Sequence, residues 1–346
     1  MGLEFGDVTI MVECSEGYTI LVFDDQRDRK GHYELLAREL HCHVEFVDLQ
    51  EKDVFAEINR VKDRLRPPAL VLVDHILNRT SGDSRKVSQK GSTVASLVRE
   101  EWPRCPILAI TAAFDECKRD ILSEIYEEVF RFEELSNLEK LIPQIIAGYR
   151  QMDQEALNVE RLLALLDAPT DERAPVLCTL PACIKDPCDP VHCMHHVYRW
   201  FRTSFYANPG FLYDERWASV MIGVDKAYFS CYVSALAPAA YRGIFGDPNA
   251  PRWWRSRLLH SVLPVSRERF TISVQEAAAR ALNVPREHFS RCYKCHDHWP
   301  EIMACVDELS LSPAEQQPMH LRCTRPHAHA PAMPFYEDLR VMLEDD

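Results

Sequence analysis

The stretch YTILVFDD, residues 18–25, is a short apolar run rich in β-formers that stops at two aspartates. A second run, ALVLV at Ala69–Val73, stops at Asp74, and a third, Pro106–Ile110, stops at Thr111. Strands that are buried on both faces of a parallel sheet read as continuous apolar runs of this kind. The three runs therefore predict strands of one parallel sheet.

Helical segments alternate with the strands. His43–Val47 and the pair Val129 and Phe130 read as two further strands. Apolar residues at helical spacing predict four helices between the strands, at Gly31–Leu40, Val54–Leu65, Thr93–Glu101 and Asp115–Ile125. This alternation is typical of a doubly wound α/β fold, here with a parallel sheet of five strands.

The residues that end the strands form the candidate site. Ligands of such sheets bind at the carboxyl ends of the strands, which here carry Asp24, Asp25, Asp74 and Thr111. Three carboxylates at one edge repel each other unless a cation neutralises them, and their hard oxygen atoms favour Mg²⁺ over Zn²⁺. An aspartate in this position can also act as a nucleophile toward a phosphoryl group and form an aspartyl phosphate.

Residues 18–149 resemble a response-regulator receiver domain, which has a flavodoxin-like fold. The resemblance rests on the residues after the first, third and fourth strands, namely Asp24 and Asp25, then Asp74, then Thr111 followed by Ala112. It implies a two-component-type signalling protein that receives a phosphoryl group from a histidine kinase or another phosphodonor protein.

The resemblance also implies a role for each site residue. Asp24, Asp25, Asp74 and the backbone carbonyl of Ile76 hold Mg²⁺. Asp74 accepts the phosphoryl group, and Thr111 forms a hydrogen bond with that group once it is attached.

Two features depart from the pattern of the family. The loop LNRTSGDSRKVSQK, residues 77–90, is longer than usual and follows the acceptor directly. After the fifth strand the family has a Lys, usually followed by Pro, whereas this chain has Arg131 and no Pro. Arg keeps the positive charge and can bind phosphate through two N–H groups, but with a different geometry. An alternative is therefore a receiver fold kept as a docking platform with little phosphotransfer.

A heptad pattern follows the predicted sheet. Apolar residues alternate at spacings of four and three from Leu138 to Leu166, which is typical of a coiled-coil seam and favours a parallel homodimer through one long helix. In the alternative, residues 138–149 cover the sheet and residues 152–166 pack on the next domain. The stretch APTDERAP at 168–175 reads as a linker. We expect a receiver-like domain at 1–150, a helical linker at 151–175 and an output domain at 176–346.

The composition limits the function classes. A chain of 346 residues holds two domains more easily than one, and 53 acidic against 40 basic residues give a net charge of −13. Such a charge does not favour a general binder of nucleic acids or of anionic membranes. We found neither an export signal nor an apolar run long enough to span a bilayer, so we expect a cytoplasmic protein with reduced thiols and no membrane partner.

The second half is predicted to be a mainly α-helical domain rich in Cys and His, and it resembles no family that we recognise. Nine of the thirteen cysteines lie after residue 150. Helical candidates are Val191–Tyr206, Asp225–Phe245, Arg252–Leu263, Val274–Leu282 and Phe335–Leu343.

Thiols and imidazoles gather in two stretches, CTLPACIKDPCDPVHCMHH at 178–196 and CYKCHDH at 292–298. Zn²⁺ prefers these ligands, and a Cys-x-x-Cys turn supplies two of the four that a structural site needs. The candidate zinc ligands are Cys292 and Cys295 together with Cys188, Cys193 and His196. Cys305, Cys323 and His327 are alternative partners, and thiols that bind no metal are a further alternative.

Residues 272–294 are similar to a helix-turn-helix of the kind found in arabinose-type transcription activators. The predicted second helix carries donors that suit phosphates and guanine edges, Arg286, His288, Arg291 and Lys294. DNA is therefore a candidate partner.

The favoured hypothesis is a signalling switch in which Mg²⁺-dependent phosphorylation of Asp74 controls a C-terminal interaction domain. One alternative is a response-regulator transcription factor that uses residues 272–294. Another is a receiver-regulated enzyme, although the chain has no Gly-rich phosphate loop, His-Glu-x-x-His or Gly-x-Ser-x-Gly motif, and we nominate no catalytic residue for it.

Overall fold

In the computed structural model the chain forms two compact units. The described residues are 17–49, 53–64, 66–79, 87–185, 190–207, 210–247, 249–263, 273–298, 302–305, 317–320 and 323. The first unit consists of Met1–Leu162 and Pro181–Arg199, and the second of Leu163–Leu180 and Trp200–Asp346. The units therefore do not divide at the expected boundaries, because residues 181–199 of the expected output domain belong to the first unit.

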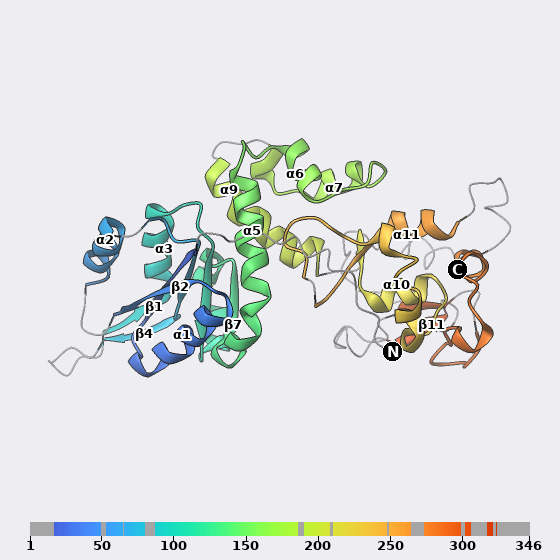
Figure 1. Ribbon diagram of the computed structural model, residues 1–346, viewed down its shortest axis with the longest axis horizontal. Helices are drawn as coiled ribbons and strands as arrows, with labels where there is room; N and C mark the ends of the chain where they lie inside the picture. The colour runs from blue at the N-terminus through green and yellow to red at the C-terminus, as the bar shows by residue number, and fades with distance from the viewer. Residues whose placement is uncertain are drawn as a thin grey trace. The chain divides into compact units, whose positions relative to one another are not determined.

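A parallel sheet of five strands forms the centre of the first unit, as predicted (Figure 1). Its strands are β1 (Thr19–Asp24), β2 (His43–Asp48), β3 (Leu70–Val73), β6 (Ile107–Thr111) and β7 (Glu128–Arg131). They lie in the order β2-β1-β3-β6-β7, and each neighbouring pair is parallel. The central strands β1, β3 and β6 are buried along almost their whole length, which explains their uninterrupted apolar sequences.

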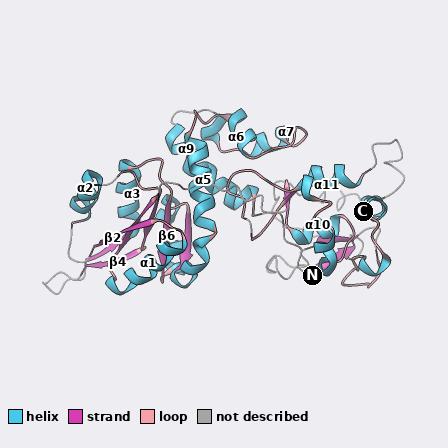
Figure 2. Cartoon of the chain, viewed as in Figure 1, coloured by secondary structure: helices cyan, strands magenta, loops and turns pink. Residues whose placement is uncertain are grey.

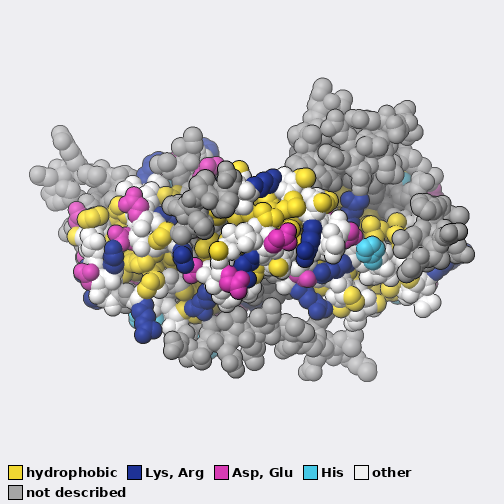
Figure 3. All heavy atoms as spheres, turned by 90° about the horizontal axis from the view of Figure 1, so that it is seen from above, with side chains coloured by type: hydrophobic (Ala, Val, Ile, Leu, Met, Phe, Trp, Pro, Cys, Tyr) yellow, Lys and Arg dark blue, Asp and Glu magenta, His cyan; other side chains and the backbone are white. Residues whose placement is uncertain are grey.

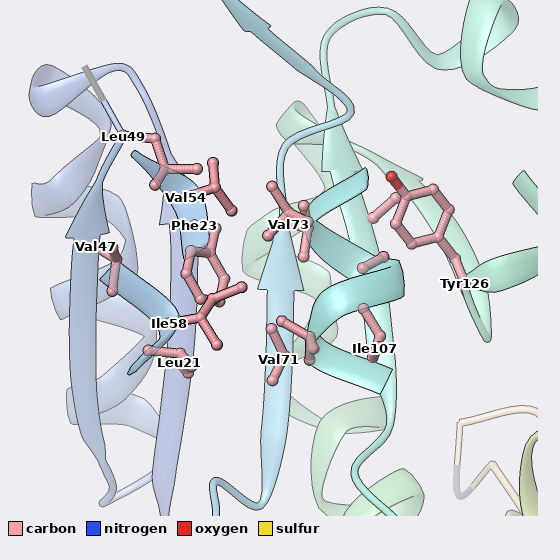
Figure 4. Packing of buried hydrophobic residues seen from close by; sticks show 14 of the residues in the cluster. Leu21, Phe23, Val47, Leu49, Val54, Ile58, Val71, Val73, Ile107 and Tyr126 are labelled. Carbon is pink, nitrogen blue, oxygen red and sulfur yellow. The ribbon is translucent and has the colours of Figure 1, made fainter. Parts of the chain in front are cut away.

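Helices α2 (Val54–Arg64) and α3 (Gly91–Glu101) bury apolar side chains against alternate residues of the sheet (Figure 4). Leu21 and Phe23 of β1 and Val71 and Val73 of β3 face this core, because side chains two apart on a strand point to the same face. The other helices of the sheet region are α1 (Lys30–Glu39), α4 (Phe114–Arg119) and α5 (Leu141–Asp153), with 3₁₀ turns η1 (Arg27–Arg29), η2 (Ile121–Ile125) and η3 (Phe132–Glu139). The helix predicted at Asp115–Ile125 is thus divided, because the backbone is extended at Asp120.

The long segment after Asp74 forms an antiparallel hairpin of β4 (Ile76–Arg79) and β5 (Val87–Lys90). Helix α3 begins directly after the hairpin, at Gly91, whose N–H donates to the carbonyl of His75 at 2.7 Å. A Cβ atom at position 91 would lie 2.1 Å from the carbonyl oxygen of Asp74, so only glycine allows this close approach. The start of α3 is therefore held next to Asp74, where the hairpin also begins.

The prediction of one long coiled-coil helix is wrong. Helix α5 ends at Asp153 and α6 (Val159–Leu165) starts anew, with the Asn158 side chain accepting from the N–H of Arg161 at 3.0 Å. Side chains of the expected seam on α5, such as Ile145 and Met152, are already buried inside the same chain. This core uses the surface that a parallel dimer needs, so the heptad pattern gives no basis for the predicted homodimer.

The second unit is mainly helical in its regular structure, as predicted (Figure 2). It contains α7 (Arg173–Thr179), α10 (Glu215–Met221), α11 (Arg255–Val262) and α12 (Val274–Ala281), while α8 (Ala182–Lys185) and almost all of α9 (Pro190–Trp200) belong to the first unit. Helix α9 continues into a π-helix, η4 (Phe201–Phe205), so the helix predicted at Val191–Tyr206 is confirmed. Short strands pair as β8 (Leu212–Tyr213) with β9 (Trp253–Trp254) and as β10 (Ile302–Cys305) with β11 (Gln317–His320).

Two helix predictions for the second unit need comment. The helix predicted at Asp225–Phe245 is wrong, because this segment forms only the 3₁₀ turns η5 (Lys226–Cys231) and η6 (Ala237–Ala239), the second with a proline in its first turn. The helix predicted at Phe335–Leu343 lies outside the described residues.

The helix-turn-helix prediction is also wrong. Helix α12 has the expected position, and the chain turns at Asn283 with φ of 51°. However, only the three-residue turn η8 (Arg286–His288) follows, because Phe289 and Arg291 enter antiparallel bridges with Val224 and His298. No recognition helix therefore carries the four candidate DNA-contacting residues in this described segment.

Those four residues have other contacts or positions. His288 stacks on Tyr228 with ring centroids 4.0 Å apart, and its Nδ1 forms a hydrogen bond with the Tyr232 hydroxyl at 2.7 Å. Lys294 donates to the carbonyl of Cys323, Arg291 lies in the bridge, and Arg286 starts η8. On the face shown in Figure 3, Lys and Arg side chains are interspersed with Asp and Glu among the described residues. Among the helices that the structure describes, none is both long and apolar enough to cross a membrane.

Candidate phosphoacceptor site

Three carboxylates meet where β1 and β3 end. Asp24 is the last residue of β1, Asp25 follows it, and Asp74 follows β3, the strand paired with β1. One oxygen from each carboxylate lies within 4.8 Å of the others, and Asp24 and Asp74 are buried. The predicted convergence is therefore present. The donor set consists of hard carboxylate oxygens, which is the chemistry that suits Mg²⁺.

Both oxygens of Asp74 have donors. Its Oδ1 accepts from the backbone N–H of Ile76 at 3.3 Å, and its Oδ2 accepts from Nη1 of Arg29 at 2.7 Å. The Thr111 side chain also forms a hydrogen bond with Asp74. Because the Thr111 Oγ1 accepts from the N–H of Ala113 at 3.1 Å, its own proton can be donated to the carboxylate. Thr111 thus lies beside Asp74, and Ile76, whose carbonyl was predicted to bind Mg²⁺, contacts Asp74 through its N–H.

Arg29 is the site residue that the sequence interpretation missed. It comes from η1, one turn after the acidic pair, and its Nη1 also lies 3.4 Å from Oδ2 of Asp24. The guanidinium is buried, and its central carbon lies 4.4 Å from the centre of the Phe132 ring. The Tyr33 hydroxyl donates to the same Asp24 oxygen at 3.1 Å. The sequence signal was a basic residue within one helical turn of the paired aspartates.

Arg131, the expected substitute for the Lys of the family, has a different environment. It is the last residue of β7 and lies beside Thr111 in the sheet register. Its guanidinium lies over the Phe114 ring at 4.4 Å and is 3.5 Å from the Asp115 carboxylate, and the side chain is half exposed. Among the described residues, the ion pair of Asp74 is with Arg29.

Burial raises the pKa values of Asp24 and Asp74. Desolvation raises the pKa of Asp24 to about 6, although the N–H of Gln26, Arg29 and Tyr33 act in the opposite direction. Desolvation also raises the pKa of Asp74 above its ordinary value, against the lowering effects of Arg29, the Ile76 N–H and Thr111. Both carboxylates therefore gain from a nearby cation, because a cation offsets the cost of burying their charges.

The strand order completes the comparison with the expected family. The order β2-β1-β3-β6-β7 corresponds to 2-1-3-4-5 among the five sheet strands, and the acidic residues lie at the carboxyl edge of β1 and β3. The first unit has a receiver fold. In this receiver unit, Asp74 follows β3 and the Thr111 side chain forms a hydrogen bond with it.

Solved receiver domains are similar to the receiver unit. One is the receiver domain of a sensor histidine kinase from Pseudomonas aeruginosa with a magnesium ion coordinated in its active-site cleft; at 20% identity and a TM-score of 0.30, the match covers 38% of this chain and 99% of that one. A receiver domain from Clostridium thermocellum matches at 14% identity over 38% of this chain and 97% of its own, with a TM-score of 0.30. A Thermotoga maritima response regulator in complex with Mg²⁺ and BeF matches at 21% identity over 36% and 98%, with a TM-score of 0.26. No family model and no curated protein matches the chain.

The predicted zinc ligands fall into two groups. Cys292 and Cys295 lie in the second unit, where their ligand atoms cluster with those of His320 and Cys323. Cys193 and His196 lie in the receiver unit, where the Cys193 thiol donates to the carbonyl of Cys183 at 3.1 Å and His196 is exposed. Among the sequence candidates, Cys323 is therefore the partner that joins the Cys-x-x-Cys pair.

The remaining zinc candidates were not brought together. Cys188 and His327 lie outside the described residues, and Cys305 is described only through its backbone in β10. His320 was missed, because it lies 25 residues after Cys295. The His-x-x-Cys spacing of His320 and Cys323 was the signal that could have found it.

Proposed function

We propose that this protein is a two-component-type signalling protein whose receiver unit accepts a phosphoryl group on Asp74 and whose second unit is the output domain. The observation that carries the proposal is the meeting of three carboxylates, each with an oxygen within 4.8 Å of the others, together with the hydrogen bond between Thr111 and Asp74. A histidine kinase or another phosphodonor protein is the partner that this chemistry requires. We also propose that Asp24, Asp25 and Asp74 hold Mg²⁺.

The phosphoryl transfer follows from the positions of these side chains. A carboxylate oxygen of Asp74 attacks the phosphorus, and the bond to the leaving group breaks as the new P–O bond forms. The leaving group, an imidazole nitrogen if the donor is a phosphohistidine, takes up a proton from solvent. Asp24, Asp25 and Asp74 would hold Mg²⁺, which would supply positive charge to the oxygens of the transferring group. Thr111 donates a hydrogen bond to the attached group. Arg29, which donates to Oδ2 of Asp74 before transfer, moves away from it or contacts the phosphoryl oxygens instead.

Helix α9 offers a route from the receiver unit to the output domain. His195 of α9 lies 2.8 Å from the carbonyl oxygen of Glu124 and 3.2 Å from the Glu127 carboxylate. Tyr198 donates to Glu128, the first residue of β7, at 2.8 Å. The chain then passes from α9 into the second unit after Arg199.

The same edge strand lies beside the acceptor. Thr111 pairs with Arg131 at the other end of β7. We propose that an acyl phosphate on Asp74 moves Thr111, that β7 follows, and that α9 transmits the change to the second unit. The DNA-binding alternative is not retained, because the recognition helix that it required is absent from residues 282–294.

The decisive experiment treats the full chain with acetyl phosphate and Mg²⁺ and measures the intact mass. We expect an adduct of one phosphoryl group in the wild type, and none in Asp74→Asn or when Mg²⁺ is omitted. Asp115→Asn is the matched control, because Asp115 is an exposed carboxylate after β6. It lies outside the acidic cluster, which consists of Asp24, Asp25 and Asp74. An adduct that persists in Asp74→Asn, or a wild type that never carries one, would contradict the proposal.

A further inference from the structure

Three thiols and one imidazole converge in the second unit. The sulfur atoms of Cys292, Cys295 and Cys323 and a ring nitrogen of His320 all lie within 4.8 Å of one another. In a tetrahedral zinc site with Zn–S bonds near 2.3 Å, ligand atoms are separated by about 3.8 Å. The cluster therefore already has nearly the spacing that one zinc ion requires, and we call these four residues the S₃N cluster.

The fold brings two short sequence motifs together to form this cluster. Cys292 and Cys295 flank a tight turn, which is closed by the hydrogen bond from the N–H of His296 to the carbonyl of Cys292 at 2.9 Å. His320 ends β11, and Cys323 follows three residues later. Cys292 and Cys295 precede the hairpin of β10 and β11, while His320 and Cys323 lie at its end. Two ligands therefore come from each side of the hairpin in sequence.

The orientation of His320 favours coordination through Nδ1. Its Nε2 lies 3.2 Å from the carbonyl oxygen of His298, and a carbonyl can only accept, so Nε2 carries the proton. Its Nδ1 then presents a lone pair, and this atom lies 3.2 Å from the Cys295 sulfur. A backbone carbonyl on the far nitrogen is the usual way in which proteins fix the tautomer of a metal-binding histidine.

Backbone groups also support the thiols. The N–H of His320 donates to the Cys292 sulfur at 3.3 Å, and Lys294 in the turn donates to the carbonyl of Cys323 at 3.1 Å. The N–H of Tyr293 donates to the carbonyl of Pro318 at 2.8 Å, which ties the turn to β11. The turn and the end of the hairpin are therefore joined by one main-chain bond, one bond from the Lys294 side chain and one bond to the Cys292 sulfur, none of which involves the ligand atoms of Cys295 and Cys323.

A small hairpin of this kind needs a further source of stability. Strands β10 and β11 have four residues each, and a two-stranded hairpin is marginally stable alone. Met319 of β11 is buried and β10 lies against α10, but the main hydrophobic cluster of this unit includes no described side chain from the turn or from β11. A metal ion that joins the turn to the end of the hairpin supplies this stability.

We propose that Cys292, Cys295, His320 and Cys323 bind one structural Zn²⁺ ion. On binding, the three thiols lose their protons to solvent and His320 binds as a neutral imidazole, which leaves the site with one net negative charge. All four positions are filled by protein side chains, so the ion holds structure and has no open position for a substrate. This site is independent of the acidic cluster in the receiver unit.

The first experiment measures metal content in the full chain after purification under reducing conditions without an affinity tag. We expect about one zinc per chain in the wild type, with a loss of at least tenfold in Cys295→Ser. Cys231→Ser is the matched control, because Cys231 is an exposed thiol of the same unit outside the S₃N cluster. Asp74→Asn should keep its zinc, so failure of this proposal and failure of the phosphorylation proposal are distinguishable.

A second experiment covers the case in which Cys295→Ser does not fold. Growth with Co²⁺ in place of Zn²⁺ gives a wild-type chain whose absorption reports the ligands directly. We expect intense tetrahedral d–d bands and a thiolate-to-cobalt charge-transfer band, both of which disappear when Zn²⁺ is added. His320→Cys should keep the metal and strengthen the charge-transfer band. A reduced wild-type chain that holds neither metal, or a disulfide between Cys292 and Cys295 in the freshly purified protein, would overturn the proposal.

Discussion

The buried guanidinium of Arg29 contacts two carboxylates of the proposed Mg²⁺ site. It lies 2.7 Å from Oδ2 of Asp74 and 3.4 Å from Oδ2 of Asp24. A metal ion on these carboxylates must therefore compete with an internal positive charge. The acidic cluster and Arg29 form a site in which affinity for a divalent cation depends on how easily one side chain moves.

Replacing Arg29 tests this competition. We expect Arg29→Gln to bind Mg²⁺ about tenfold more tightly, a gain of about 1.4 kcal/mol, because the carboxylates lose their intramolecular partner. Calorimetric titration of the full chain with Mg²⁺ measures the change. Arg27→Gln is the matched control, since Arg27 is exposed on the same turn and pairs with Asp48. Weaker Mg²⁺ binding by Arg29→Gln would show that the guanidinium assists the site.

The buried carboxyl of Asp24 predicts a pH dependence. Its pKa is about 6 in the folded chain against 3.8 in the unfolded one, so the neutral form is the favoured buried form. The stability that this preference contributes is fully present below about pH 4 and is lost as the pH rises through 6, at a cost of about 3 kcal/mol. Added Mg²⁺ should therefore stabilise the receiver unit more at pH 8 than at pH 5.

Urea unfolding of the full chain in Mg²⁺-free buffer at pH 5 and pH 8 measures this difference. Asp24→Asn should flatten the pH dependence and raise the free energy of unfolding at pH 8. Asp28→Asn, an exposed acid on the following turn, should leave the dependence unchanged. The assignment is wrong if the wild type and Asp24→Asn respond to pH in the same way.

Sequence alone located the carboxylates but did not find Arg29, the arginine that pairs with Asp74 in the structure. Asp24, Asp25 and Asp74 follow buried runs of β-formers, and a parallel sheet brings such strand ends to one edge. The direction of a long side chain is not fixed by its position in the sequence. Arg131 stands next to Thr111 in the sheet and still turns to Phe114, whereas Arg29 reaches Asp74 from a turn.

At the scale of elements, helix α9 docks on a buried ionic network of the receiver unit. The Glu127 carboxylate accepts from Arg99 at 2.8 and 2.9 Å, from the Tyr149 hydroxyl at 2.6 Å and lies 3.2 Å from His195. Burial alone raises the pKa of Glu127, but Arg99 and His195 outweigh it and lower this pKa below its ordinary value. The network holds a helix that lies far along the chain from the sheet.

Removing the link between α9 and this network tests the docking. We expect His195→Ala to lower the free energy of unfolding of the receiver unit by about 1–3 kcal/mol, because the buried Glu127 carboxylate loses one of its partners. Denaturant titration of the full chain measures this loss. His196→Ala, an exposed neighbour on the same helix, should cost less than about 0.5 kcal/mol. Equal effects of the two substitutions would contradict the docking role of His195.

The strands of the receiver unit were predictable, and in the second unit the helices predicted at Arg252–Leu263 and Val274–Leu282 are present as α11 and α12, whereas the one predicted at Asp225–Phe245 is not. Buried parallel strands carry their identity in continuous apolar runs, so β1, β3 and β6 were found within one residue. The segment after Asp225 has apolar residues that suit a helix, but Pro238 and packing against Trp253 favour short 3₁₀ turns. The heptad pattern was genuine in spacing, and its apolar face was used inside one chain.

At the scale of the whole molecule, the proposed switch joins the acceptor to the second unit through α9. We expect acetyl phosphate with Mg²⁺ to change amide hydrogen exchange in β7 and in residues 190–200 of the wild type. Strand β7 pairs with β6 at Thr111, and Tyr198 of α9 donates to Glu128 of β7. Peptide-level mass spectrometry measures the exchange. The Asp74→Asn chain should show no change, and an unchanged wild type would separate phosphorylation from α9.

The path of the chain has a consequence for recombination and design. Residues 163–180 leave the receiver unit for the second unit, and residues 181–199 return before the chain departs again. A cut after residue 150 therefore separates α9 from the network around Glu127. A foreign receiver joined to residue 151 would leave α9 without this contact. Residues 181–199 belong to the first unit although they follow a segment of the second. A chimera must therefore exchange them along with the sheet.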